Sequence, residues 1–178
     1  MNTRKMVFAA MFVALGIVIP RVFHMIGGAA LGSVLLPMHL PVLIGAMLIG
    51  PFYGLIIGIG SVLVGFLLGM PAMPMAAFMF FELATYGLVA GYFGFNRKMN
   101  VYLSLILAML IGRVVSLSAM LIAIHLLGIS LPPVFGTIAM FSTGIPGMIL
   151  QVVIVPPLVI LLRRLFDFEQ SDQPVKSS

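Results

Sequence analysis

The chain has 178 residues, of which 62% are hydrophobic and only 7% are charged, and its mean hydropathy is +1.28. Soluble domains carry about 25% charged residues, so this composition excludes a soluble globular protein and predicts an integral membrane protein. The net charge of +5 does not indicate nucleic-acid binding in this class, because it reflects where lysine and arginine lie around a membrane. The lack of cysteine excludes disulfides and thiolate metal sites.

The first apolar segment follows Arg4 and Lys5 and in this respect resembles a signal peptide. No convincing small-x-small cleavage site follows it, and later segments are more hydrophobic. Residues 6–23 are therefore predicted to form a retained membrane helix, since a span requires roughly 17–25 apolar residues. The Gly-rich segment 25–37, which ends at Pro37, is predicted to be a loop.

The next apolar stretch, residues 38–68, is too long for one span and contains Gly50-Pro51. Because this dipeptide favours a turn, the stretch is predicted to form two helices. The sequence GMPAMP at 69–74 predicts another turn, and LGISLPP at 127–133 a further loop. Long continuous apolar runs favour helices over a membrane barrel, whose segments alternate in polarity over about ten residues. The predicted helices after the first are 38–50, 51–69, 75–94, 101–127 and 138–164.

Basic residues indicate the orientation of these six helices, which place both termini on one side. The basic pairs that fall on that side are Arg4 and Lys5, Arg97 and Lys98, and Arg163 and Arg164. The positive-inside rule makes this side the cytoplasm, with Arg21 near the outer side as the exception. We therefore expect an all-α protein of the cell membrane. It has one six-helix transmembrane domain over residues 1–165 and a polar, disordered cytoplasmic tail over 166–178.

Two groups of small residues predict close helix contacts. The first group lies on one face of the third helix, where small residues let helix backbones approach in lipid. Internal packing is expected there, with a role in substrate passage as the alternative. The second group is a pair in the first helix, Ala10 and Ala14, which by itself is compatible with packing inside the chain or contact with a second membrane protein. The first group consists of Gly54, Gly58, Ser61, Gly65 and Gly69.

Two charged residues lie deep inside predicted spans, Glu82 in the fourth helix and Arg113 in the fifth. Such charges cost roughly 2.5–3.5 kcal/mol on insertion scales, so each requires a partner or a function. With a rise of about 1.5 Å per residue and a core about 30 Å thick, both lie about 12 Å from the outer side. Two interpretations stay open: a structural ion pair that holds the helices in register, or contacts with a polar ligand in an outward-facing cavity.

The polar neighbours of these charges favour the ligand interpretation. Tyr86 lies four residues after Glu82, and Ser116 lies three residues after Arg113, so each shares a helix face with its charge. Gln151 in the last helix falls near the middle of the membrane and could join them, although a simple interhelical hydrogen bond is the more economical explanation for it. These residues are the candidate ligand contacts.

The three histidines, His24, His39 and His125, all fall near outer helix ends. Their spacing matches no metal-binding motif, so no metal site is predicted, and we expect them to be packed or interfacial. His39, which lies between two prolines in LPMHLP, is the best candidate of the three for facing a cavity.

Several functional classes lack their motifs in this sequence. No Walker motif is present, no aspartate pair lies at membrane depth, and no GxSG serine has a partner histidine. We therefore predict no catalytic residues, no cofactor and no enzyme activity, and the chain cannot couple ATP by itself. Six helices without a strong internal repeat are also small for a secondary transporter. A stand-alone secondary transporter or channel for a small polar solute nevertheless stays the alternative function.

The sequence resembles a known family, the substrate-binding S components of energy-coupling factor (ECF) transporters. The resemblance covers the chain up to about residue 165 and is to the group that includes the components for folate, pantothenate, hydroxymethylpyrimidine and vitamin B6. It rests on the size, the six spans, and Ala10-x-x-x-Ala14 after a short basic start. It also rests on LPMHLPVLIGAMLIGPFYGLIIG at 36–58 and MAAFMFFELATYGLVAGYF at 75–93.

The resemblance implies a protein that binds a water-soluble vitamin or precursor from outside with high affinity. Such proteins then associate in the lipid membrane with one transmembrane coupling protein and two ATPases, and Ala10 and Ala14 would contact the coupling protein. The ligand would lie under segments 25–37 and 69–74, against the outer halves of helices four to six. A pyrimidine or pyridine ring is expected slightly ahead of pantothenate, whose carboxylate Arg113 could hold, and folate is larger and less expected.

Overall fold

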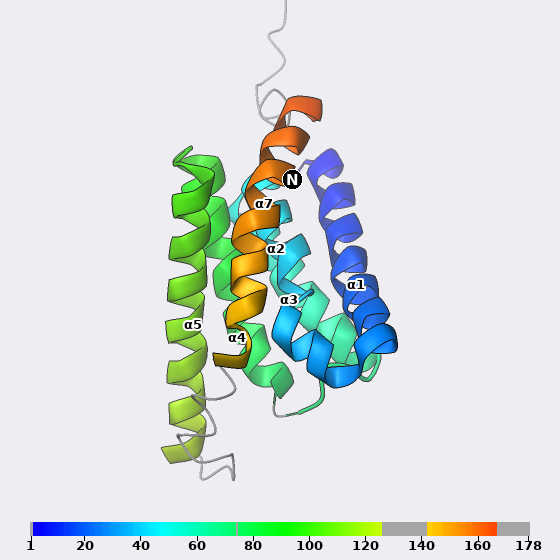
Figure 1. Cartoon of the computed structure of the whole chain (residues 1–178). Coiled ribbons are helices and arrows are strands. Elements are labelled where there is room, and N and C mark those ends of the chain that lie inside the picture. Colours follow the sequence, from blue (N-terminus) through cyan, green and yellow to red (C-terminus); the bar gives the residue numbers. More distant parts are fainter. Residues whose placement is uncertain (1, 74, 126–141, 167–178) are drawn as a thin grey trace, which may run out of the picture.

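The computed structural model describes residues 2–73, 75–125 and 142–166, and in these ranges every regular element is a helix (Figure 1). Five segments are long and apolar enough to cross a membrane, and α3 is a shorter apolar helix. The predicted all-α membrane class is therefore confirmed for this part of the chain. The elements are α1 (Thr3–Leu35), α2 (His39–Ile49), α3 (Pro51–Leu67), α4 (Met75–Gly91), the π-helical turn η1 (Tyr92–Asn96), α5 (Val101–His125) and α7 (Ile145–Leu165).

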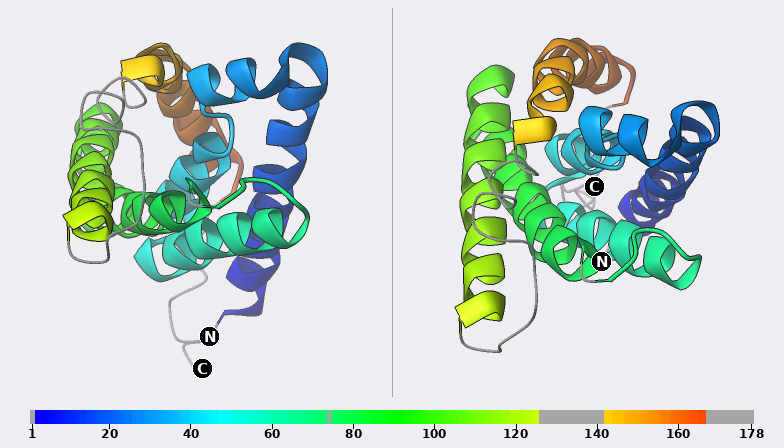
Figure 2. Two further views of the ribbon diagram at one scale, coloured as in Figure 1. Left: turned by 90° about the horizontal axis from the view of Figure 1, so that it is seen from below. Right: turned by 60° about the horizontal axis from the view of Figure 1, so that its bottom comes forward.

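The first helix differs most from its prediction. The expected loop at 25–37 is wrong, because α1 continues to Leu35 with a single break at Gly28, where φ is 65° and ψ is −167°. Only glycine adopts this conformation without strain. In a membrane, helical backbone is favoured because it satisfies its own hydrogen bonds, so apolar residues resume the helix after the break. The arm after Gly28, drawn in lighter blue, crosses one end of the bundle towards the start of α7 (Figure 2).

The predicted break between the second and third helices is confirmed. Gly50 ends α2 with φ of 102°, its N–H bonds to the carbonyl of Ala46 at 3.0 Å, and Pro51 begins α3. Proline is well placed there, because the first turn of a helix needs no backbone N–H. The predicted loop at 127–133, the start of the last helix at 138 and all but the first residue of the tail 166–178 lie outside the described residues.

Helix α2 forms the centre of the bundle. Ten of its 11 residues are buried, and it contacts α1, α3, α4, η1 and α7. A helix that is apolar on all sides is expected to be enclosed by protein, and this is what positions its first residue, His39, inside the molecule.

The glycines of α3 bring its backbone close to that of α4. A Cβ atom at Gly54 would overlap the carbonyl oxygen of Gly87, and one at Gly58 would overlap that of Leu83. Ser61, on the same helix, instead lies against Gly16 of α1. The expected internal packing is thus confirmed for these positions, and it allows the dispersion contacts that hold helices together in lipid.

The three predicted pairs of basic residues lie together, at the end of the bundle where α1 begins and α7 ends (Figure 1). There, Arg163 Nη2 donates hydrogen bonds to the carbonyls of Met47 at 2.9 Å and Gly94 at 2.7 Å. The ammonium group of Lys5 lies 4.7 Å from the ring centroid of Phe95. We call this region the basic end of the bundle.

Candidate ligand-binding site

A cavity of about 800 Å³ lies towards the other end of the bundle. Its volume is within the range of about 300–1,000 Å³ that is typical of small-molecule sites. Its walls come from α1, α2, α4 and α5, from the segment between α1 and α2, and from residues 69–73 between α3 and α4. Six methionines contribute to the lining: Met38, Met70, Met73, Met75, Met79 and Met120. The polar residues that line it are Arg21, His24, Ser33, His39, Glu82, Arg113, Ser116 and Thr143.

Glu82 is the centre of the polar part of the cavity wall. It is only 4% exposed, and three side chains approach the same carboxylate oxygen, Oε1. Arg113 Nε lies 3.3 Å from Oε1, His39 Nε2 lies 3.5 Å from it, and the Tyr86 hydroxyl donates a hydrogen bond to it at 3.1 Å. The predicted proximity of Glu82 and Arg113 is therefore confirmed, and His39 joins them from α2.

The other carboxylate oxygen of Glu82, Oε2, is not engaged in this way. The closest polar contacts of Glu82 with Arg113, His39 and Tyr86 are all made through Oε1. Oε2 is also not among the polar atoms that the protein encloses without a partner, so it is accessible from the cavity. A carboxylate oxygen of this kind accepts hydrogen bonds from a ligand that carries N–H or O–H groups.

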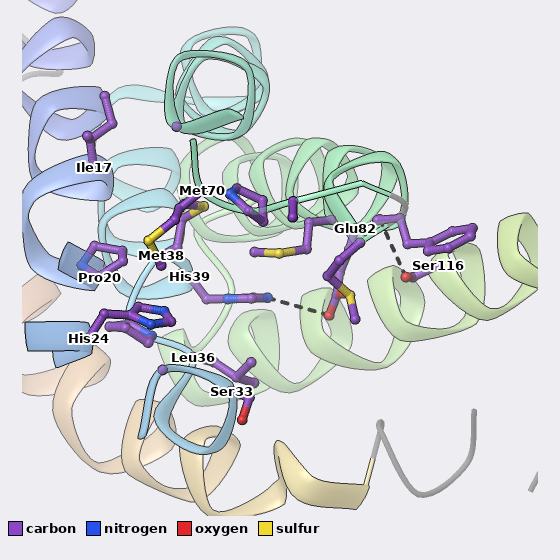
Figure 3. Close-up of a pocket in the computed structure, with 18 of the residues that line it drawn as sticks. Ile17, Pro20, His24, Ser33, Leu36, Met38, His39, Met70, Glu82 and Ser116 are labelled. Atoms are coloured by element: carbon purple, nitrogen blue, oxygen red, sulfur yellow. Dashed lines mark hydrogen bonds and ion pairs between the residues drawn. The ribbon is translucent and has the colours of Figure 1, made fainter. Parts of the chain in front are cut away.

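His39 reaches the cavity because the chain turns sharply before α2. Its backbone N–H bonds to the carbonyl of Leu36 at 3.1 Å, and its side chain points from the start of α2 towards Glu82 (Figure 3). The imidazole packs edge-on against Tyr86, with ring centroids 5.3 Å apart. His39 is 1% exposed, and its Nδ1 has no hydrogen-bond partner among the described residues.

Two candidate residues support the wall of the cavity from behind. Tyr86 fits against Gly112 of α5, where a Cβ atom would overlap its ring. Gln151 of α7 is buried, and its Nε2 donates a hydrogen bond to the carbonyl of Leu36 at 3.4 Å. The hydrogen bond expected for Gln151 is thus present, but neither Tyr86 nor Gln151 lines the cavity.

The last candidate, Ser116, lines the cavity from α5. Its hydroxyl donates a hydrogen bond to the carbonyl of Phe78 at 3.4 Å, which links α5 to α4 (Figure 3). Ligand contact stays a prediction for Ser116, as it does for Glu82, Arg113, Tyr86, His39 and Gln151.

The ligand was expected under segments 25–37 and 69–74, and residues of both segments line the cavity. The sequence did not predict that Arg21 and His24 of α1 line it as well, since His24 was expected to be packed or interfacial. The signal for Arg21 was available, because its predicted place near the outer side departs from the positive-inside pattern. His125 is exposed, and its ring nitrogen lies 3.0 Å from the carbonyl of Leu121 in its own helix. Among the described residues no group of three side chains could hold a metal ion.

The alanine pair of α1 lies outside the core. Ala10 and Ala14 are exposed, and they share this surface with the exposed side chains of Val7, Met11 and Leu15. Internal packing within the described chain therefore does not account for the pair.

Comparison with known proteins identifies the family of the chain. Residues 4–159 match the family model for the substrate-specific component of ECF transporters. No curated protein and no solved structure matches the chain. Components of this family are parts of a transporter and not enzymes. They bind a small substrate and work with a membrane coupling protein and ATPases. The chain therefore belongs to the ECF transporter substrate-specific components and is a multi-pass membrane protein that binds the substrate of an ECF importer.

Proposed function

We propose that this protein binds a water-soluble vitamin or vitamin precursor with a small pyrimidine- or pyridine-like ring. The ring would occupy the cavity next to Glu82, and the importer complex would then move the vitamin into the cell with energy from ATP hydrolysis by its ATPases. The observation that carries this proposal is the carboxylate of Glu82, which three side chains hold through Oε1 while Oε2 is accessible from the cavity.

The arrangement suits a heterocycle with an amino or hydroxymethyl group. Oε2 of Glu82 accepts a hydrogen bond from such a group. Because Glu82 is almost fully buried, a missing hydrogen bond there costs more than it would in water. Ligands that lack the donor group are thereby rejected.

The methionines of the cavity favour an aromatic ligand. The chain has no tryptophan, and Phe78 is the one phenylalanine among the described lining residues. Six methionine side chains provide flexible, polarisable surface instead. Sulfur–aromatic contacts contribute about 0.3–1.5 kcal/mol each, so these residues can hold a ring without a stacking partner.

Pantothenate is the second candidate ligand. The observation in its favour is that two arginines, Arg21 and Arg113, line the cavity, and arginine binds carboxylates through charge-assisted hydrogen bonds. Against it, the guanidinium of Arg113 already lies next to Glu82, so its charge is balanced within the protein.

The proposed orientation in the cell membrane has the basic end in the cytoplasm and the cavity facing outwards. The support is the gathering of Arg4/Lys5, Arg97/Lys98 and Arg163/Arg164 at one end, as the positive-inside rule requires. In this orientation a vitamin enters from outside, and both termini are cytoplasmic.

The proposed contact with the coupling protein is the exposed face of α1 around Ala10 and Ala14. Small residues on a lipid-facing helix let a partner helix approach closely. Replacement of both alanines by leucine is expected to abolish co-purification of the coupling protein while ligand affinity stays unchanged. Loss of ligand affinity with intact assembly would contradict this assignment.

Mass spectrometry of the small molecule that stays bound during purification tests the ligand proposal most directly. We expect a pyrimidine or pyridine compound, whereas pantothenate would favour the second candidate.

Reconstitution into proteoliposomes tests the alternative of a stand-alone carrier. Uptake is expected to require ATP and the ATPases, and accumulation by the chain alone with an ion gradient would overturn the importer assignment.

A further inference from the structure

Arg21 is the charged residue of the cavity for which the proposed site gives no role. It lies on α1, one turn before His24, and both residues line the cavity. Its Nη2 donates a hydrogen bond to the carbonyl of Leu68, the residue that caps α3, at 3.0 Å. One guanidinium N–H is used in this contact, and a guanidinium has further N–H donors.

No carboxylate balances the charge of Arg21 in the described structure. The single acidic residue in the described ranges is Glu82, whose contacts are with His39, Tyr86 and Arg113. The other three acidic residues lie outside the described residues. Apart from the histidines, the charged residues that line the cavity are two arginines and one glutamate, so the arginines outnumber the carboxylate.

The polar groups of the cavity lie at two separate places. Figure 3 shows His24 on one side of the pocket and Glu82 with Ser116 on the other, with Met38, Met70 and His39 between them. Arg21 belongs to the same helix face as His24. A ligand that fills this cavity thus meets polar groups at both ends, with Met38, Met70 and the imidazole of His39 between them.

We propose that the ligand carries an anionic group, a carboxylate or a phosphate, that binds to Arg21 while its ring lies next to Glu82. This inference rests on the function proposed above and narrows it to acidic derivatives of such rings. The anion supplies the negative charge that the protein does not provide at this position, and a guanidinium binds both kinds of anion through charge-assisted hydrogen bonds.

The alternative role for Arg21 is structural. A cation near the C-terminus of a helix stabilises its last carbonyl groups, and Arg21 does contact Leu68 in this way. The substitution Arg21→Gln separates the two roles, because the amide of glutamine keeps an N–H donor for this carbonyl but carries no charge. Arg21→Lys keeps the charge and changes the geometry.

The experiment measures dissociation constants by titration calorimetry for matched pairs of probes, on protein purified in maltoside detergent. The pairs are pyridoxine and its phosphate ester, hydroxymethylpyrimidine and its phosphate ester, nicotinate and nicotinamide, and pantothenate and pantothenol. In at least one ring pair, the wild-type protein is expected to bind the anionic member about tenfold more tightly or better, as for a charge-assisted hydrogen bond. Arg21→Gln should reduce this ratio to near one, and Arg21→Lys should restore part of it.

Arg97→Gln is the matched control, because Arg97 lies at the basic end and bonds to Tyr92. It should leave the ratio unchanged. The ratio should also fall as salt is added, since screening weakens interactions between accessible charges. Thermal unfolding of each variant, measured without probe, reports whether Arg21→Gln has affected the cap of α3.

Three outcomes would overturn the inference. Equal binding of both members of every ring pair would show that no anion is recognised, although the proposed ring site would stand. Equal weakening of both members by Arg21→Gln would leave Arg21 with the structural role alone. A preference for the anionic probe that disappears when the protein is moved from maltoside into phospholipid nanodiscs would show that Arg21 binds a lipid phosphate. Binding of pantothenate and pantothenol without any ring compound would instead contradict the proposed function.

Discussion

The two ends of the helix bundle use their polar side chains in different ways. At the basic end, Arg163 donates to two backbone carbonyls, and Lys5 lies over the ring of Phe95. At the cavity end, Oε2 of Glu82 is left for a ligand, because Arg113, His39 and Tyr86 approach the carboxylate most closely at Oε1. Polar groups that are satisfied within the protein stabilise the fold, whereas polar groups left accessible in an enclosed space are suited to bind a ligand. Substitutions at the cavity end should therefore change ligand affinity, and substitutions at the basic end should change stability.

The largest effect on binding is expected for Glu82→Gln. The ligand loses the carboxylate that accepts its N–H or O–H group, and a hydrogen bond to a charged group contributes about 1.5–3 kcal/mol. The loss of the pair with Arg113 lowers the stability of the free protein in addition. Calorimetry with the retained small molecule should show this loss of affinity. The matched control is Thr85→Ala on the exposed side of α4, where the hydroxyl bonds only to Phe81. Unchanged affinity in Glu82→Gln, with reduced thermal stability, would mean that Glu82 is a structural residue and would remove the contrast between the two ends.

At the opposite end, Arg163→Ala should reduce stability and leave affinity unchanged. Hydrogen bonds that involve a charged group contribute about 1.5–3 kcal/mol each, and Arg163 makes two that join α7 to α2 and η1. Thermal unfolding in detergent measures the effect. Arg164→Ala is the control, since the neighbouring side chain is exposed. A weakened affinity in Arg163→Ala at unchanged stability would show that the basic end is coupled to ligand binding.

A smaller effect is expected for Gly112→Ala, which perturbs the cavity from behind. The added methyl group overlaps the ring of Tyr86, and overpacking of this kind costs typically about 1–3 kcal/mol. Because Tyr86 bonds to Glu82, we expect weaker ligand binding as well as lower stability. Gly60→Ala provides the comparison, since a Cβ there meets only the side chain of Val13. If Gly112→Ala lowers stability alone, Tyr86 does not position the carboxylate for the ligand.

The smallest effect is expected for Ser116→Ala. Its hydroxyl makes one long hydrogen bond, to the carbonyl of Phe78, and a neutral hydrogen bond contributes about 0.5–1.5 kcal/mol. Ser118→Ala is a close control, because Ser118 lies in the same helix and bonds at the exposed surface to Val114. A ligand affinity that falls in Ser116→Ala and not in Ser118→Ala would assign the hydroxyl to the binding site, whereas equal affinities in both variants would restrict Ser116 to joining α4 and α5.

Local chemistry made much of the fold predictable. The Gly50-Pro51 turn follows from backbone sterics, and the contact of Glu82 with Arg113 follows from their equal depth on consecutive helices. Local chemistry also explains the wrong prediction of a loop at 25–37. The glycines of this segment would favour a loop in a soluble protein, but here the helix α1 is interrupted only at Gly28 and then resumes.

The sequence by itself determined the membrane class, the positions of most helices, and the level at which Glu82 and Arg113 meet, because these depend on hydropathy, on proline and glycine, and on the rise of a helix. Only the tertiary structure decided which residues complete the cavity. His39 is separated from Glu82 by the whole of α2 and α3, and Arg21 comes from α1. Such neighbours depend on how α2 is enclosed by the other helices and on where the arm after Gly28 crosses the bundle, and packing of this kind leaves no periodic signal along the chain.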